Sequence, residues 1–162
     1  MKKIQASILT MVIVYDTDKE QILLLNRPKE NGFPGYLGPG GKIEFGESFS
    51  EGAVRELYEE TGIVVKPEDL SYKGVDEYIL KDDNYRYMVF NYITTTFSGK
   101  LLENPPEGEL RWVTLDEAFE LPMQSWFKRR LPFFFEDGTF EISIHLKDSE
   151  SEPFKEIIRK VG

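Results

Sequence analysis

The sequence contains no cysteine, and only one histidine, His145, among its 162 residues. Disulfides, thiolate nucleophiles and zinc–thiolate sites are therefore excluded, and a cluster of histidine ligands cannot form. Any catalytic chemistry has to come from carboxylates, hydroxyls or a hard metal ion. Because a chain without disulfides suits a reducing compartment, we expect a cytoplasmic location.

Long apolar runs are also missing. The longest, Ile8 to Tyr15, is interrupted by Thr10 and is far shorter than the ~20 residues that a membrane-spanning helix needs. We therefore expect no membrane partner. The side chains carry 20 positive and 29 negative charges, a formal net charge of −9, which disfavours binding to duplex nucleic acid. A small-molecule ligand is expected instead, and an anionic one would need a metal ion.

The overall composition is typical of one folded domain. Hydrophobic residues make up 40% and charged residues of both signs 30%, which excludes an intrinsically disordered chain. The length is close to the usual size of a domain. We predict a single domain over residues 1–162, as a monomer or a homodimer, in which the polar tail 147–162 docks loosely as a helix.

Apolar and β-branched runs between turn residues predict the strands. Strands are expected over 4–15, 22–25 and 110–113, a long hairpin over 72–80 and 85–97, and a closing hairpin built from 133–135 and 140–146. Three prolines and five glycines within 28–41 predict an irregular loop over a site, and we expect its first part, 28–35, to be able to close as a lid.

Two capping-box patterns predict helix starts, one at Ser48 with Glu51 and one at Thr114 with Glu117. The first helix should end at Gly62, since glycine favours the left-handed conformation that follows a helix. A further helix is expected over 123–131.

The segment from Gly41 to Ile63, GKIEFGESFSEGAVRELYEETGI, holds six acids but only two bases. On a helix, Glu56, Glu59 and Glu60 fall within about 100° of one another. Such like charges disfavour a helix unless something neutralises them. Carboxylates without histidine or cysteine suit Mg²⁺, with Mn²⁺ as the alternative. A solvated acidic face is the other interpretation.

The same segment matches the pattern G-x5-E-x7-R-E-U-x-E-E-x-G-U, in which U is aliphatic, at every position. The matching residues are Gly41, Glu47, Arg55, Glu56, Leu57, Glu59, Glu60, Gly62 and Ile63. A chance match has a probability on the order of 10⁻⁷, which disfavours the solvated face. On these residues the chain resembles the Nudix hydrolases, with residues 41–63 as the Nudix box. The resemblance implies an α/β fold, an α/β/α sandwich around a mixed β-sheet.

The resemblance also implies an enzyme that uses divalent ions to hydrolyse a phosphate anhydride. By this resemblance Glu56, Glu59 and Glu60 are metal ligands, and the Gly40 carbonyl is a fourth. Arg55 pairs with the box carboxylates and orients them, and the supporting residues are Gly41 and Glu47.

The general base often lies outside the box in this family. The fragment 107–112 resembles the segment that carries it, and Glu107 is our choice there. Glu109 and Glu60 are the alternatives, and a surface acid is the non-functional interpretation.

Residues 33–42 resemble the segment before the box in MutT-like enzymes, which hydrolyse oxidised purine nucleoside triphosphates. This implies hydrolysis of 8-oxo-dGTP to the monophosphate and pyrophosphate. The candidate substrate-binding residues are Arg27 and Lys42 for the phosphates, Gln124 for the purine, and Phe33, Tyr36 and Trp126 for stacking. Each aromatic residue has a place in the core as its alternative role.

Two other functions are compatible with the box. One is hydrolysis of another nucleoside diphosphate-linked compound, of the dinucleoside polyphosphate or ADP-ribose type, and Tyr78 lies near a tyrosine of the former group. The other is a nucleotide-binding module without catalysis. Such modules usually lack box carboxylates, whereas all three helix glutamates are present here.

Overall fold

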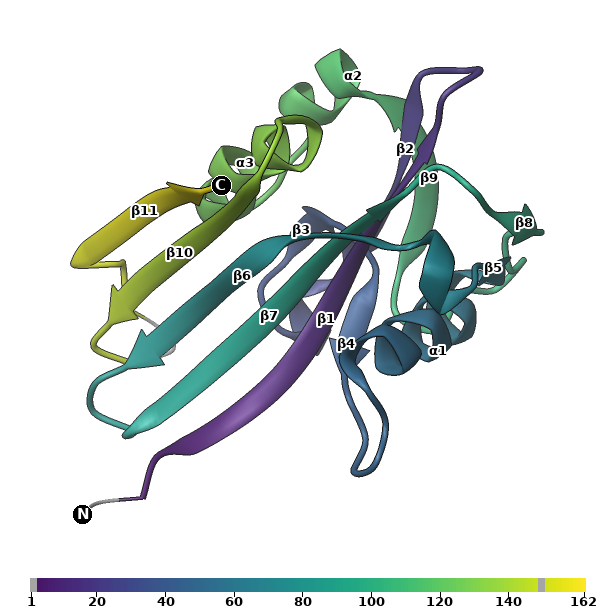
Figure 1. The fold of residues 1–162 in the computed structure, drawn as a ribbon. Helices are drawn as coiled ribbons and strands as arrows, with labels where there is room; N and C mark the ends of the chain where they lie inside the picture. Colours follow the sequence, from purple (N-terminus) through teal and green to yellow (C-terminus); the bar gives the residue numbers. More distant parts are fainter. Residues whose placement is uncertain (1–2, 149–150) are drawn as a thin grey trace.

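A computed structural model describes residues 3–148 and 151–162, and a mixed β-sheet of nine strands dominates it (Figure 1). The strands are β1 (Gln5–Asp16), β2 (Gln21–Arg27), β3 (Gly35–Leu37), β4 (Gly40–Lys42), β6 (Ser71–Leu80), β7 (Tyr85–Thr94), β9 (Glu109–Thr114), β10 (Thr139–Leu146) and β11 (Lys155–Val161). Along the sheet the order is β11-β10-β6-β7-β1-β2-β3, while β4 pairs with β1 and β9 with β2. The pairs β1–β7 and β10–β6 are parallel and the others antiparallel.

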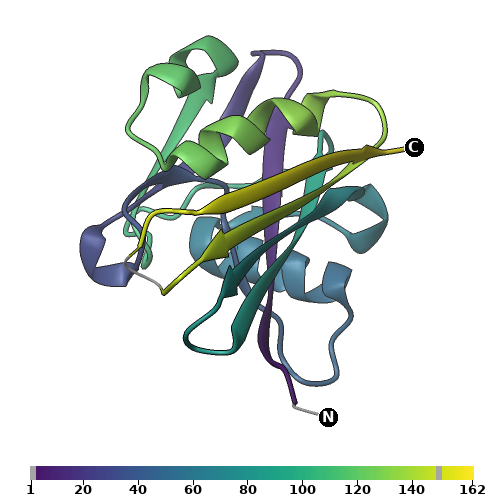
Figure 2. The same ribbon diagram turned by 90° about the vertical axis from the view of Figure 1, so that its left-hand side faces the viewer.

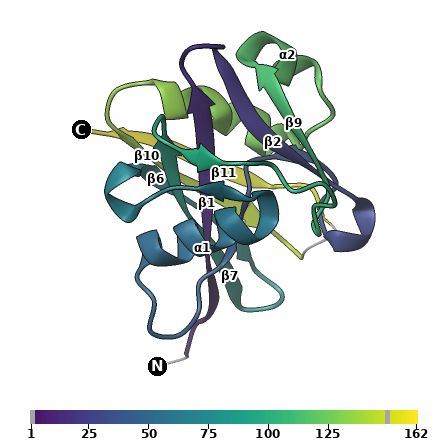
Figure 3. The same ribbon diagram turned by 90° about the vertical axis from the view of Figure 1, so that its right-hand side faces the viewer.

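Helices and two short strands complete the fold. They are α1 (Phe49–Thr61), α2 (Leu115–Glu120), α3 (Ser125–Arg130), the 3-10 turns η1 (Lys29–Asn31), η2 (Pro67–Asp69) and η3 (Leu131–Phe135), and the pair β5 (Ile63–Val64) and β8 (Ser98–Gly99). Figure 3 shows α1 in front of the sheet, and Figure 2 shows the short helices between β9 and β10 on another side of it.

Each face of the sheet has its own hydrophobic core, because successive side chains of a strand point to opposite faces. Ile13 packs with Phe127 of α3 and with Ala118 of α2 in one core. Val12 packs with Leu57 of α1 in the other. All five side chains are fully buried. Helices therefore cover both faces, which confirms the predicted α/β/α sandwich around a mixed sheet.

The start and end of α1 follow from local sequence. The Ser48 hydroxyl accepts a hydrogen bond from the Glu51 amide at 3.1 Å, and the Glu51 carboxylate accepts one from the Ser48 amide at 3.2 Å. Gly62 ends the helix in the left-handed region, with φ of 84°. The predicted capping box and helix end are confirmed, as is the second capping box at Thr114 and Glu117.

Three of the predicted elements are wrong. The tail does not form a helix, because β11 completes the sheet by antiparallel pairing with β10, with Ile142 opposite Ile158. Residues 133–135 form no hairpin strand: they belong to η3, where Phe134 turns back to pack against Phe140 at 5.8 Å between ring centroids. The loop 28–41 is partly regular, because β3 and β4 pair with β2 and β1.

Residues 3–148 and 151–162 contain no helix that is long and apolar enough to cross a membrane. This agrees with the absence of long apolar runs from the sequence.

Leu57 offers a test of how α1 is held. Its side chain is fully buried between α1 and the sheet, whereas that of the neighbouring Tyr58 is 57% exposed. Leu57→Ala should lower the free energy of unfolding by about 2–5 kcal/mol, because it removes buried methyl groups and leaves a cavity. Urea denaturation measures this, and Tyr58→Ala is the matched control, expected to change stability far less. Equal losses in both variants would contradict the packing described.

Candidate functional site

The acidic face of α1 lies against the loop that carries β4. The Gly40 amide donates a hydrogen bond to Glu60 Oε2 at 2.9 Å. A side chain at Gly41 would place its Cβ 2.5 Å from the Glu56 carboxylate, and one at Gly40 would place it 1.9 Å from the Thr10 carbonyl oxygen. The two glycines therefore let the backbone pass between β1 and the helix glutamates.

Arg55 joins the acids of this region into one network. Its Nε and Nη2 donate to the two oxygens of Glu47 at 2.9 and 2.7 Å, a fork-shaped pair. Its Nη1 donates to Glu56 at 2.9 Å and to Glu59 at 3.2 Å. Its Nη2 also donates to the Lys42 carbonyl at 3.0 Å. One side chain thus connects the end of β4, the loop before α1 and two of the three helix glutamates.

The network shifts the pKa values of its members. The hydrogen bonds from Arg55, with help from the Glu44 amide, lower the pKa of Glu47 to about 2. The hydrogen bonds with Glu47, followed by those with Glu56, raise the pKa of Arg55 above its usual value. Both groups are therefore ionised over the whole neutral range, and the pair stays intact there.

The other helix glutamates lie in a setting that disfavours their charge. Burial raises the pKa of Glu60 to about 8, against the opposing effect of the hydrogen bond from Gly40. Burial also raises the pKa of Glu56, although Arg55 opposes this shift. The negative charge of Glu107, on the loop before β9, contributes to both increases. The negative charges of Glu56 and Glu60 are therefore not fully balanced by positively charged groups of the protein.

The donor chemistry fits a hard divalent ion, since these groups are carboxylates held together against their mutual repulsion. Among residues 3–148 and 151–162, however, no three acids or histidines converge as a ready metal site. Glu59, whose side chain is 56% exposed, is hydrogen-bonded to Arg55 instead. Glu56 and Glu59 thus share one nitrogen of Arg55, while Glu60 is hydrogen-bonded to the Gly40 amide.

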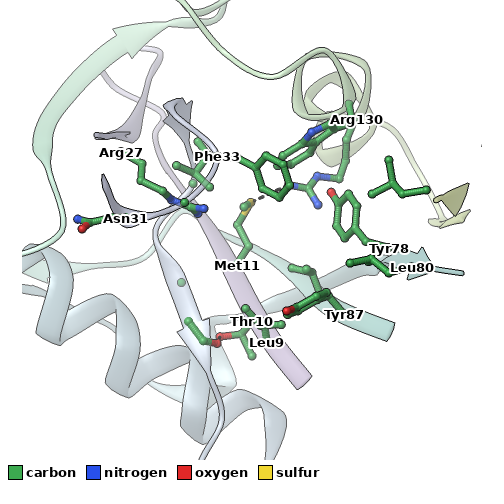
Figure 4. A pocket seen from close by; sticks show the side chains of 18 residues that line it. Leu9, Thr10, Met11, Arg27, Asn31, Phe33, Tyr78, Leu80, Tyr87 and Arg130 are labelled. Atoms are coloured by element: carbon green, nitrogen blue, oxygen red, sulfur yellow. Dashed lines mark hydrogen bonds between the residues drawn. The ribbon is translucent and has the colours of Figure 1, made fainter. Parts of the chain in front are cut away.

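A cavity of about 370 Å³ is lined in part by Gly40 and Gly41, the glycines that lie against Glu60 and Glu56. Figure 4 shows this cavity from close by. Its lining is mostly apolar and aromatic. The residues that line it are Leu9, Thr10, Met11, Arg27, Asn31, Gly32, Phe33, Leu37, Gly38, Gly40, Gly41, Tyr78, Leu80, Tyr87, Val89, Trp126, Arg130 and Leu146. A cavity of this size and polarity is typical of small-molecule sites.

The candidate substrate-binding residues divide into two groups. Arg27, Phe33 and Trp126 line the cavity, and the rings of Phe33 and Trp126 meet edge to face at 6.0 Å. Burial lowers the pKa of Arg27, against the opposing attraction of Glu60 and then of Glu107. The charges of Glu60 and Glu107 therefore act on Arg27, which also lines the cavity.

The other three candidates lie outside the cavity lining. Tyr36 is only 7% exposed and belongs to the core. Gln124 uses its Nε2 to donate to the Pro34 carbonyl at 2.9 Å, which fastens the start of β3 to the turn before α3. Lys42 is exposed, and its carbonyl rather than its side chain takes part in the Arg55 network.

Sequence reasoning missed a buried ion pair at the inner end of the cavity. Arg130 and Asp76 are both 1% exposed and form a salt bridge. The available signal was that Arg130 follows Phe127 by three positions and precedes Phe134 by four, which places it on the buried side of its helix. Asp76 is likewise a charged residue within β6, a strand in which half of the residues are apolar or aromatic.

A family model described as the NUDIX domain matches residues 8–134. The uncharacterized Nudix hydrolase YvcI of Bacillus subtilis is 34% identical over 113 residues, which cover 68% of each chain. An ADP-ribose pyrophosphatase of Methanocaldococcus jannaschii is 43% identical over 105 residues, covering 64% of this chain and 61% of that protein.

Solved structures give the same assignment. The crystal structure of a mutator MutT protein from Bacillus halodurans superposes with a TM-score of 0.81 at 33% identity, over 94% of this chain and 97% of that one. Both its fold and its length thus correspond to those of this protein. From the family match, the relatives and this structure, we conclude that the chain belongs to the Nudix hydrolases, enzymes that act on acid anhydrides.

Proposed function

We propose that this protein hydrolyses a nucleoside triphosphate to the monophosphate and pyrophosphate, with 8-oxo-dGTP as the first substrate to test. The observation that carries this proposal is that Gly40 and Gly41, which lie against Glu60 and Glu56, also line the apolar cavity. A nucleoside in the cavity would have its phosphates next to the carboxylates. The likeness to a MutT protein supports the choice of an oxidised purine nucleotide.

Mg²⁺ is the proposed cofactor, with Mn²⁺ as the alternative. Glu56, Glu59 and Glu60, with the Gly40 carbonyl, would hold it. The ion supplies positive charge against the diphosphate and lowers the pKa of water. Arg27 lies at the same end of the cavity and offers a guanidinium to the phosphate oxygens. The proposed partner is thus a small-molecule nucleotide, and the proposed assembly is a monomer or a homodimer.

In this proposal Arg55 is a positioning residue. It fixes one oxygen of Glu56 at 2.9 Å and is itself fixed by the two oxygens of Glu47. The second carboxylate oxygen of Glu56 is thereby held in a constant orientation, whereas the carboxylate of an unbound glutamate is mobile.

Glu107 is the proposed general base, which takes the proton from the attacking water as the phosphorus–oxygen bond breaks. Its side chain is exposed, and its charge acts on both Glu56 and Glu60. Its carbonyl accepts a hydrogen bond from Asn31 Nδ2 at 3.4 Å, which links its loop to a residue of the cavity wall. Electrostatic coupling to Glu56 and Glu60 thus favours Glu107 over Glu109, whose backbone is paired with that of Asn26 in the sheet.

A second candidate substrate is a nucleoside diphosphate-linked compound such as ADP-ribose. The specific observation in its favour is the 43% identity with a relative named ADP-ribose pyrophosphatase. The proposed metal chemistry is the same for both substrates, so that only the occupant of the cavity differs.

A substrate panel tests the proposed activity. With Mg²⁺ present, kcat/KM should be highest for 8-oxo-dGTP among 8-oxo-dGTP, dGTP, the other dNTPs, ADP-ribose and a diadenosine polyphosphate. Glu59→Gln should lower turnover of the preferred substrate by about 10²-fold or more, because it removes a charge from the metal-binding face. A preference for ADP-ribose would select the second candidate. No turnover of any member would reject hydrolysis in favour of nucleotide binding alone.

Glu107→Gln tests the general base. We expect kcat to fall by about 10²-fold or more while the variant keeps the thermal stability of the wild type, since general-base catalysis contributes about that much. Glu109→Gln, two residues away, is the matched control and should keep its rate. Full activity in a folded Glu107→Gln variant, or a loss in Glu109→Gln alone, would remove Glu107 from the mechanism.

Acid denaturation tests the pair of Glu47 and Arg55. Because the pKa of Glu47 is about 2 in the folded protein, against 4.5 ordinarily, the ionised carboxylate stabilises the fold at every pH above about 4.5. That contribution disappears as the pH falls towards 2.

Melting temperatures measured from about pH 6 down to about pH 3 should therefore fall more steeply for the wild type than for Glu47→Gln. Glu103→Gln, an exposed acid outside the Arg55 network, should follow the wild-type curve. Parallel curves for the wild type and Glu47→Gln would show that the ion pair does not stabilise the fold.

A further inference from the structure

The inner end of the cavity contains a buried cation with unused hydrogen-bond donors. Arg130 is 1% exposed and lines the cavity. Its Nη2 donates to the sulfur of Met11 at 3.2 Å, which is a weak acceptor. Its Nε has no hydrogen-bond partner among the described residues. Because a buried donor without a partner is costly, such a group requires an explanation.

Its partner Asp76 already has partners on both of its carboxylate oxygens. Asp76 Oδ2 accepts a hydrogen bond from the Tyr78 hydroxyl at 2.7 Å and forms the salt bridge with Arg130. Asp76 Oδ1 accepts one from Asn91 Nδ2, also at 2.7 Å. This arrangement holds the guanidinium in one position and balances its charge. The inner end is therefore close to neutral but offers donors, a combination that fits a neutral acceptor better than an anion.

The two ends of the cavity differ in chemistry. Arg27 lies with Gly40 and Gly41 at the end beside the glutamates. At the other end, the Trp126 ring meets the Tyr78 ring edge to face at 5.1 Å, and the Arg130 guanidinium lies 5.7 Å from the centroid of Trp126. Figure 4 shows Arg130 beside Tyr78 and across the cavity from Arg27. A nucleotide whose phosphates lie near the glutamates would place its base among these aromatic rings.

We propose that Arg130 determines base specificity, by donating hydrogen bonds to the 6-oxo group of a purine. The inference rests on the proposed function and names the base that the cavity selects. Guanine and hypoxanthine present the acceptors O6 and N7 on one edge, which a guanidinium fork matches. Adenine has a 6-amino group in place of O6, so that an N–H donor of the base would face an N–H donor of the guanidinium. The oxidised base 8-oxoguanine keeps the 6-oxo group but carries a hydrogen on N7, so that it would accept from Arg130 through O6 alone.

The pair dITP and dATP isolates this contact, because the two bases differ in the 6-oxo and 6-amino groups and the adjoining ring proton. With Mg²⁺, the wild type should hydrolyse dITP with a kcat/KM about 10-fold or more above that for dATP. Arg130→Lys keeps the charge that Asp76 needs but loses the fork, and should bring the ratio close to one, mainly by raising KM for dITP. Arg129→Met, on the exposed side of the same helix and paired with Glu156, should keep the wild-type ratio.

A second variant and a binding measurement complete the test. Asp76→Asn with Arg130→Met removes both charges together, so that no unpaired charge stays buried, and should also lose the preference. Calorimetry should show that the wild type binds IMP more tightly than AMP. This experiment separates the inference from the proposed hydrolysis, since it needs no turnover.

Three results would overturn the inference: equal kcat/KM for dITP and dATP in the wild type, a preference that persists in folded Arg130→Lys, or equal binding of IMP and AMP. If the wild type hydrolyses neither triphosphate, the proposed function fails, and the inference then depends on the calorimetric comparison alone.

Discussion

The hydrogen bonds of Arg55 are the interactions on which the active site depends. Three carboxylates on one face of a short helix repel one another, and the helix would gain from turning them towards water. Arg55 binds two of them and is bound in turn by Glu47, which the chain supplies from the loop before the helix. The loop and the helix are therefore fixed to each other at the point where negative charge is concentrated.

Arg55 and Arg130 differ in how deeply they are buried and in how many acidic partners they have. Arg55 is partly exposed and exchanges hydrogen bonds with several acids, so that the loss of one partner leaves others. Arg130 is almost wholly buried and has a single carboxylate partner, Asp76. Breaking a buried pair costs far more than breaking an exposed one, because the remaining charge has no water around it. A buried ion pair adds little to the stability of a core, and the proposed role of Arg130 in base recognition would give this pair another function.

The parts of the fold that depend on local sequence could be predicted. The limits of α1 follow from Ser48, Glu51 and Gly62, which act within one turn of the helix ends. The tail could not be predicted in the same way, because Ile157 and Ile158 are equally compatible with a helix and with a strand. Its conformation is decided by the free edge of the preceding strand, β10, whose place at the edge of the sheet depends in turn on pairing with the distant β6.

The same distinction, between features set by local sequence and features set by contacts with other parts of the fold, applies to the site. The Nudix box is contiguous, so its glutamates were chosen as candidates from their spacing and from the family resemblance. Arg27, Phe33 and Trp126 were chosen as separate substrate-binding candidates, and the structure places all three in the lining of one cavity. Gln124 was chosen by its position relative to the purine-binding residue of MutT-like enzymes and Tyr36 by residue type, and neither tells whether a side chain faces the cavity or the chain itself. Arg130 and Asp76 are 54 positions apart, and only the packing of α3 on the sheet brings them together.

The last strand, β11, also affects how readily the edge of the sheet can pair with a second chain. β11 covers the edge of β10 and itself becomes the outermost strand, in which four of the seven residues are charged: Lys155, Glu156, Arg159 and Lys160. Charged side chains on an open strand hinder pairing with a second chain. A protein shortened before this strand would expose the backbone of β10, whose sequence TFEISIHL carries one acid and no lysine or arginine. β11 therefore covers a backbone edge of β10 that would otherwise be open to pairing with a second chain.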